Sequence, residues 1–186
     1  MSDRLATRAG LPDALRALAD AYPRDLWESH REFDGLTRFW LERHLMFRTL
    51  LARSTEAAER HLDAPDDPRG FAAVTARLMG RFLDHLHGHH RIEDHHYFPT
   101  LSRLDPRLGP GFDLLEADHH DLDGHLHALA ETTNTALRAL AGGTAAQDET
   151  AAYLAGLRRL GRFLDRHLTD EEDLVVPVIL HHAPDL

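Results

Sequence analysis

The stretch HHRIEDHHYFP at residues 89–99 contains a histidine and a glutamate four residues apart, His89 and Glu93, within a segment of helical periodicity. The same spacing recurs near the end of the sequence, at His167 and Glu171. Residues four apart lie on one face of an α-helix. Each pair therefore places an imidazole beside a carboxylate on a single helix face, and in the last helix that face is otherwise lined by leucines.

Around these pairs, long segments with helical periodicity alternate with clusters of helix-breaking residues. Four such segments run from about residue 25 to 62, 69 to 97, 112 to 141 and 146 to 176. Because short loops between long helices favour antiparallel neighbours, the sequence predicts an all-α fold, an antiparallel up-down-up-down four-helix bundle over residues 25–186. Residues 1–24 are expected to form an N-terminal arm with a short helix at 12–19. Pro99 and Pro177 are expected to end the second and fourth helices.

Composition limits the classes of function. The 186 residues include 31 acidic and 21 basic side chains, and the net charge of −10 argues against nucleic acid or an anionic membrane as a partner. No apolar run approaches the roughly 18 residues that a membrane-spanning helix needs, and the first residues lack the apolar stretch of a signal peptide, so we expect a cytoplasmic protein. The absence of cysteine excludes disulfides, iron–sulfur clusters and thiolate zinc sites. Histidine, with 16 residues, is unusually abundant.

Each predicted helix places a histidine on its apolar stripe, and these four are His44, His89, His119 and His167. With a rise of ~1.5 Å per residue, antiparallel packing brings all four to one level of the bundle within about one helical turn. Glu93 and Glu171 are displaced from that level toward the same end. On the second helix the predicted stripe also includes His85, Ile92 and His96.

Four imidazoles beside two carboxylates in a water-poor core are suited to two adjacent divalent cations. The carboxylates can bridge the ions and cancel part of their charge. Without metal, two buried glutamates would be costly unless they were protonated or paired. Nitrogen and oxygen ligands without thiolate suit iron, so the sequence predicts two iron ions, although such a site also accepts other divalent metals.

The order and spacing of these residues resemble the hemerythrin-like, or HHE cation-binding, family over about residues 36–180. The resemblance implies a non-haem di-iron pair that acts on dioxygen, peroxide or nitric oxide. It implies that the metal ligands are His44, His89, Glu93, His119, His167 and Glu171.

The chain departs from the family's oxygen carriers at two positions. Those proteins have a second histidine four residues after the one on the third helix, where this chain has Asp123, and their last acidic ligand is an aspartate one residue beyond the position of Glu171. In an antiparallel bundle Asp123 should lie near His85. Either His85 supplies a seventh ligand, or it hydrogen-bonds to Asp123 in the second shell and serves as a proton donor. Either arrangement leads us to expect redox turnover rather than stable oxygen carriage.

Other readings of the histidines remain. A ferritin-like site would use Glu-x-x-His motifs, which occur at Glu93-x-x-His96 and Glu116-x-x-His119. The neighbours His90 and His120 could replace His89 and His119, but the heptad register favours the first residue of each pair. The other histidines are predicted to be mainly solvated, and these are His30, His61, His87, His90, His95, His120, His125, His127, His181 and His182.

Two classes of function follow from such a site. One is an enzyme, an oxidase or a peroxidase-like oxidoreductase, in which the metal pair activates oxygen or peroxide. The other is a protein that stores, senses or carries iron, dioxygen or nitric oxide without turnover.

Overall fold

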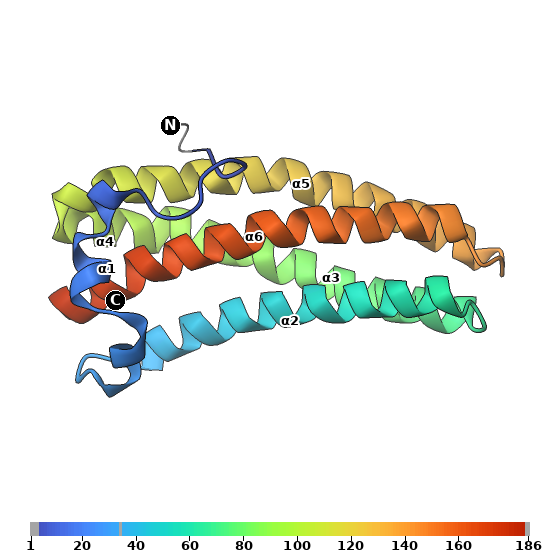
Figure 1. The fold of residues 1–186 in the computed structure, drawn as a ribbon, viewed down its shortest axis with the longest axis horizontal. Coiled ribbons are helices and arrows are strands. Elements are labelled where there is room, and N and C mark those ends of the chain that lie inside the picture. Colours follow the sequence, from blue (N-terminus) through green and yellow to red (C-terminus); the bar gives the residue numbers. More distant parts are fainter. Residues whose placement is uncertain (1–3, 34, 185–186) are drawn as a thin grey trace. The chain divides into compact units, whose positions relative to one another are not determined.

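The computed structural model describes residues 4–33 and 35–184, and within these ranges the regular elements are all helical. The predicted all-α class is confirmed for this part of the chain. The long helices can be followed by colour in Figure 1, and they are α2 (Gly35–Asp63), α3 (Pro68–Ile92), α5 (Gly109–Ala141) and α6 (Gln147–His182).

The N-terminal arm is built from short elements, namely η1 (Asp13–Leu15), α1 (Ala17–Ala21) and η2 (Arg24–Ser29). The first long helix was predicted to begin near residue 25, and this is wrong, because residues 24–29 form a separate 3₁₀ turn. That turn is fixed by Trp27, which is buried and whose indole N–H donates to the carbonyl oxygen of Tyr22 at 2.7 Å.

The prediction that Pro99 and Pro177 end helices is also wrong. After α3 the chain continues through a π-helical turn, η3 (Glu93–Tyr97), into α4 (Phe98–Leu104) and the short η4 (Pro106–Leu108). Pro99 lies in the first turn of α4, where a missing N–H costs little. Pro177 lies inside α6 among buried apolar residues, including Val176 and Val178, whose packing offsets the lost backbone hydrogen bond.

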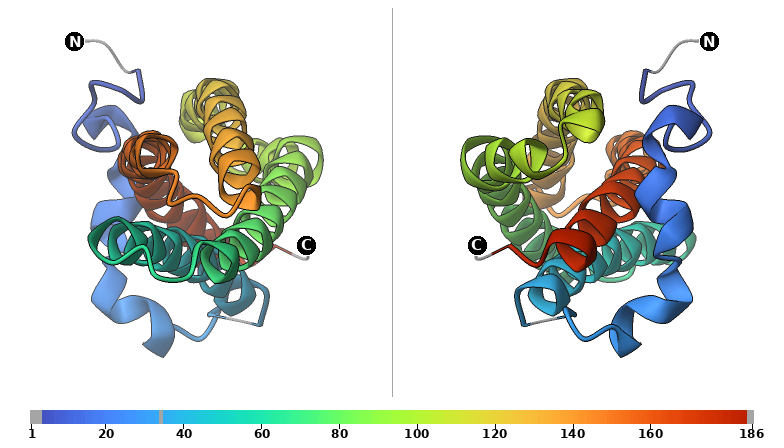
Figure 2. Two further views of the ribbon diagram at one scale, coloured as in Figure 1. Left: turned by 90° about the vertical axis from the view of Figure 1, so that its right-hand side faces the viewer. Right: turned by 90° about the vertical axis from the view of Figure 1, so that its left-hand side faces the viewer.

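The chain forms two compact units. The first comprises residues 1–45, 89–121 and 163–186. Its main apolar core joins Trp40, Phe98, Phe112 and Leu174 to three leucines of the arm, Leu11, Leu15 and Leu18. Burial of such side chains contributes roughly 1.5–3 kcal/mol each. The arm therefore belongs to the core of this unit, and it lies along the last part of α6 (Figures 1 and 2).

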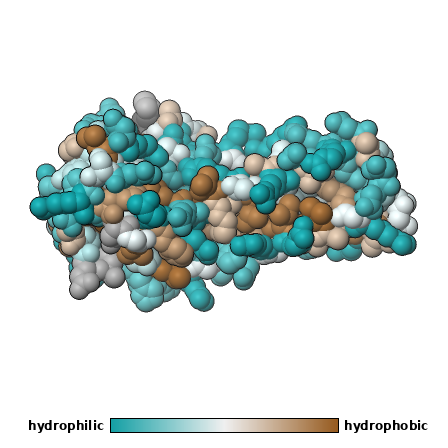
Figure 3. Space-filling model, turned by 90° about the horizontal axis from the view of Figure 1, so that it is seen from below, coloured by the Kyte–Doolittle hydropathy of each residue, from teal (hydrophilic) through white to brown (hydrophobic). Residues whose placement is uncertain are grey.

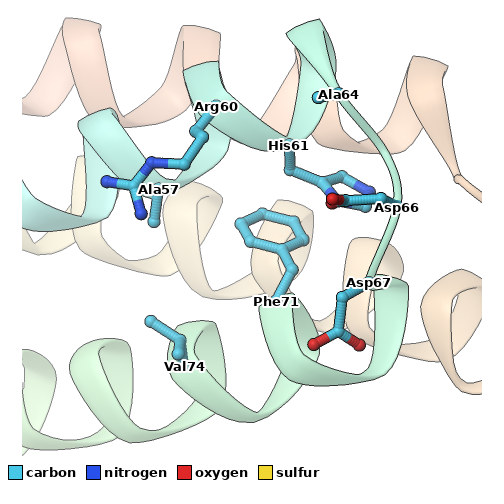
Figure 4. A pocket seen from close by; sticks show the side chains of 8 residues that line it. All are labelled: Ala57, Arg60, His61, Ala64, Asp66, Asp67, Phe71 and Val74. Carbon is cyan, nitrogen blue, oxygen red and sulfur yellow. The ribbon is translucent and has the colours of Figure 1, made fainter.

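The second unit comprises residues 46–88 and 122–162. Its core includes an edge-to-face pair of Phe47 and Phe82, with ring centroids 6.2 Å apart. His61 was predicted to be solvated, but it is 5% exposed. Figure 4 shows its ring over that of Phe71, and the centroids are 4.3 Å apart with nearly parallel planes. Its Nε2 lies 2.9 Å from the carbonyl oxygen of Ala145, so His61 is a hydrogen-bonded core residue.

Hydrophilic side chains cover most of the face seen in Figure 3, with apolar residues between them. In the described ranges no helix is both long and apolar enough to cross a membrane.

Candidate metal centre

Seven buried or nearly buried side chains in the first unit form two groups of metal-ligand type. Within each group, one nitrogen or oxygen atom from every residue lies within 4.8 Å of the others. The first group contains His44, His89, Glu93 and Glu171, and the second contains His90, His119 and His167. The residues come from α2, α3, η3, α5 and α6.

Glu93 and Glu171 each direct one carboxylate oxygen to each group. Oε1 of Glu93 lies 2.9 Å from Nε2 of His89, and its Oε2 lies 3.8 Å from Nε2 of His119. The arrangement on α6 is equivalent, with 3.5 Å from Glu171 Oε1 to His44 Nε2 and 3.3 Å from Glu171 Oε2 to His167 Nε2. Both carboxylates are therefore placed to bridge two cations.

Several polar atoms at this centre are buried without a hydrogen-bond partner. They are both carboxylate oxygens of Glu93, Oε2 of Glu171 and Nε2 of His90. An orphaned buried polar group costs roughly 1–3 kcal/mol, and more if it is charged. The Nε2 atoms of His44 and His89 also lie only 3.1 Å apart, and those of His119 and His167 3.2 Å apart. Unpartnered oxygens and converging nitrogens fit cations, so the residues present suit a metal pair.

On their outer side, three of the imidazoles contact carboxylates. Nδ1–H of His44 donates to Glu172 at 3.0 Å, and that of His119 donates to Asp94 at 2.7 Å. Nδ1–H of His167 donates to Asp118 at 3.3 Å. An ionised carboxylate only accepts hydrogen bonds, so the proton is on Nδ1. The Nε2 atom then faces the centre, as in the carboxylate–histidine–metal arrangement of protein metal sites.

A comparison with known protein families finds the hemerythrin HHE cation-binding domain over residues 35–179. The chain belongs to this family. Among curated proteins and among solved structures, no match was found. The hemerythrin match includes all seven grouped residues and leaves the N-terminal arm outside it. The hemerythrin-family domain is a cation-binding domain, and the two His/Glu groups are where a cation can be held.

Electrostatics at the hemerythrin centre divide the imidazoles into two kinds. Burial, with the neighbouring imidazoles, lowers the pKa of His89 to about 3 and that of His90 well below its ordinary value. Burial also acts against the charged form of His167, but Asp118 and Glu171 outweigh it and raise the pKa of His167 to about 9. His89 and His90 are thus ready to bind metal, whereas His167 must first release a proton.

The two glutamates are shifted in opposite directions. Burial and the adjacent Glu171 raise the pKa of Glu93 well above its usual range. Burial opposes ionisation of Glu171 too, but His44 and His167 more than compensate, and its pKa lies well below the usual range. Without metal, one proton on Glu93 relieves the repulsion between the carboxylates, and a cation pair can replace that proton.

Trp40 contacts the centre directly. Its indole N–H donates to Oε1 of Glu171 at 2.8 Å and lies 3.0 Å from Nε2 of His44. Its ring meets that of Tyr97 with centroids 5.0 Å apart. The signal in the sequence was its position one turn before His44.

The structure brings together the six residues that the sequence singled out as ligands and adds His90, which was predicted to be solvated. That prediction is wrong, since His90 is 5% exposed and its ring stacks on His119 with centroids 4.0 Å apart. His85 and Asp123 belong to neither group. Both lie in the second unit, and Asp123 is exposed.

The helical register of α3 differs from the predicted one, which placed His85 on the buried stripe. The predicted stripe included Ile92 and His96, but both are exposed. The buried stripe is rotated by one residue, and it contains Phe71, Thr75, Met79, Phe82, Leu86, His90 and Glu93. The ferritin-like alternative needed His96 and Glu116, and these side chains are also exposed. The centre therefore follows the hemerythrin pattern.

Proposed function

We propose that the chain binds two iron ions, one in each group, at the interior of an antiparallel four-helix bundle. The observation that carries this proposal is the placement of Glu93 and Glu171, each with one oxygen toward each group. The unpartnered oxygens of these buried carboxylates support it further. Iron is favoured over softer metals because every donor is an imidazole nitrogen or a carboxylate oxygen.

The two metal positions differ in the number of protein donors. The position at His44 and His89 has two imidazoles and one oxygen from each glutamate, four donors in all. The position at His90, His119 and His167 has three imidazoles and the two remaining oxygens, five donors in all. For six-coordinate ions, the first position has more room for a small molecule. When bound, an iron pair supplies electrons and open coordination positions to dioxygen, peroxide or nitric oxide.

We infer that the centre carries out redox turnover, as an oxidase or a peroxidase-like enzyme. The inference rests on the partial exposure to solvent of the four-donor position at His44 and His89. The side chain of His89 is 11% exposed, whereas His44 and Glu171 are fully buried. Small molecules and protons therefore approach from the side of His89, and delivery of protons assists cleavage of an O–O bond. The expectation of turnover from the sequence rested on His85, either as a ligand or as a proton donor beside Asp123. Neither residue belongs to the two groups, and in this proposal His90 takes the place of the seventh ligand.

The alternative is binding without turnover, as in a carrier, a store or a sensor of iron, dioxygen or nitric oxide. The observation in its favour is His90, because with it the two groups contain seven ligand-type residues. Seven is also the number of ligand residues in the oxygen carriers that the sequence resembles.

One experiment separates these functions. The protein is loaded anaerobically with ferrous iron, its metal content is measured, and its absorption spectrum is followed through cycles of air and argon beside an assay of peroxide breakdown. We expect two iron ions per chain, irreversible oxidation in air and consumption of peroxide. A spectrum that returns over many cycles, without peroxide consumption, would establish the carrier. Zero or one ion after loading would refute the dinuclear proposal.

A further inference from the structure

Two arginines of the N-terminal arm contact the outer carboxylates of the metal centre. Arg8, with 4% of its side chain exposed, donates through Nη1 to Asp118 at 2.7 Å and through Nη2 to the second oxygen of the same carboxylate. Its Nε donates to Asp170 at 2.6 Å. Asp118 is the carboxylate that accepts from Nδ1 of His167. A continuous chain of hydrogen bonds thus links Arg8 to the five-donor position.

Arg24 makes the equivalent link to the four-donor position. Its Nη1 donates to Glu172 at 2.6 Å, and its Nε donates to Asp173 at 2.8 Å. Glu172 is the carboxylate that accepts from Nδ1 of His44. Each metal position therefore has one histidine whose outer partner is ion-paired to the arm.

The arm also holds the segment of α6 that carries Glu171. Its neighbours Asp170 and Glu172 bind Arg8 and Arg24, respectively, so the bridging glutamate stands between two anchored residues. In a further contact the donor is on α6 and the acceptor is in the arm, because Arg166 donates to the carbonyl oxygen of Ala9 at 2.8 Å. The acidic run at 170–173 is thus divided between the metal centre and the arm.

The two arginines supply charge and hydrogen bonds to carboxylates that are themselves buried. Asp118 is 2% exposed and Glu172 is 6% exposed. Each of them accepts from an arm arginine on one side and from the Nδ1–H of a histidine on the other. The carboxylate is thereby held where it accepts the Nδ1 proton, and Nε2 of that histidine is directed at the centre.

We propose that Arg8 and Arg24 are positioning residues of the metal centre, and that the N-terminal arm, outside the matched hemerythrin domain, completes the centre. Arg8 orients His167 through Asp118, and Arg24 orients His44 through Glu172. The inference rests on the proposed pair of metal ions. It assigns one arginine to each ion, so the loss of either arginine should weaken one metal position more than the other.

The test is titration of the metal-free protein with Co²⁺, whose absorption reports the geometry of its ligands. The variants are Arg8→Ala and Arg24→Ala, with His167→Ala and His44→Ala as references for loss at each position. Removal of an outer partner of a metal-ligating histidine lowers metal affinity by roughly 10–100-fold, and we expect about tenfold for one equivalent in each arginine variant. The spectrum of Arg24→Ala should change in the direction of His44→Ala, and that of Arg8→Ala in the direction of His167→Ala.

Arg107→Ala is the matched control, because Arg107 also binds a buried carboxylate with two bonds, to Asp105 at 2.8 and 2.6 Å. It should leave both Co²⁺ equivalents unchanged. Arg8→Lys keeps the charge but loses the bidentate hydrogen bond to Asp118, so it should restore part of the metal affinity that Arg8→Ala loses. It replaces the alanine variant in the test if that variant does not fold. Unchanged affinity and spectrum in both arginine variants, or equal weakening of both equivalents, would overturn the inference. Fewer than two equivalents in the wild-type protein would instead refute the dinuclear site.

Discussion

The indole N–H of Trp40 on α2 donates to Oε1 of Glu171 on α6, 131 residues away in the sequence, at 2.8 Å. The accepting oxygen is the one that faces His44, at 3.5 Å. This hydrogen bond helps to orient a carboxylate that lies between both groups of donors. The other oxygen of Glu171 lies 3.3 Å from Nε2 of His167, so Trp40 and His167 hold the two ends of the same carboxylate.

Replacement of Trp40 by Phe should remove that hydrogen bond while most of the ring packing is kept. Hydrogen bonds to charged groups contribute about 1.5–3 kcal/mol, so we expect a loss of that order in the free energy of unfolding of the metal-loaded protein, with an altered metal absorption band. Phe82→Leu is the control, because this buried ring lies in the second unit, where it pairs with Phe47. It should destabilise the protein without changing the metal spectrum.

His90→Ala should remove a donor from the five-donor position. We expect metal content to fall by about one ion per chain. The ion at this position is lost because Nε2 of His90, which is buried and has no hydrogen-bond partner, is one of its donors. The other ion is kept because the imidazoles of the four-donor position remain in place. Metal analysis after anaerobic loading measures this. His85→Ala, in the second unit, should keep both ions. If His90→Ala instead keeps both ions and His85→Ala loses metal, the alternative in which His85 is the seventh ligand would be supported.

Glu171→Ala should reduce binding at both positions, because its oxygens face both groups. His181→Ala, on the exposed end of the same helix, should have no effect. Metal content and melting temperature, each with and without a chelator, provide the measurement. For an ion present at 100 times its dissociation constant the stabilisation is about 2.7 kcal/mol, so chelation should lower the melting temperature of the wild-type protein strongly and that of Glu171→Ala only slightly.

The metal-free protein should lose stability as the pH rises above neutrality. The pKa of His167 is raised from 6.5 to about 9, so protonated His167 contributes stability that is fully present below pH 6.5 and is lost as the pH rises to about 9. The melting temperature of metal-free protein should fall across this window. His167→Gln should flatten the fall, and an equally steep fall in that variant would contradict the assignment.

Metal should reverse this dependence on pH. His167 must release its proton before Nε2 can bind, and burial leaves Glu93 with a raised pKa, so it too must lose a proton. Binding at neutral pH should therefore release protons, and acid should release metal. Calorimetric titration with Co²⁺ in two buffers of different ionisation enthalpy measures the protons released, and a value of zero would show that these groups are not ligands.

Four of the six residues that the sequence singled out are related in pairs by a spacing that helical geometry interprets directly, whereas His44 and His119 were found from the apolar stripes of their helices. His89 and Glu93, or His167 and Glu171, share a face at four residues apart. His90 could not be found in this way. Adjacent residues point about 100° apart around an α-helix, so a single stripe admits only one of the pair His89 and His90.

The outer residues were missed for a different reason. Asp94 and Asp118 look like ordinary acidic residues of a helix surface, and Arg8 and Arg24 lie in a segment without periodicity. Their roles depend on contacts between different helices or with the arm, from 25 positions apart for Asp94 and His119 to 110 for Arg8 and Asp118, which no local pattern reveals. The continuation of the helix through Pro99 was missed too. It follows a π turn in which the N–H of Phe98 donates to the carbonyl oxygen of Glu93. Such a turn has no simple signal in the sequence.

His89 and His90 belong to different groups although a single peptide bond joins them. A rotation of α3 about its axis would move both imidazoles at once, one toward its own group and the other away from its group. With cations in both groups, as proposed, a change at one cation that displaces its histidine would therefore be transmitted to the other through the backbone of α3.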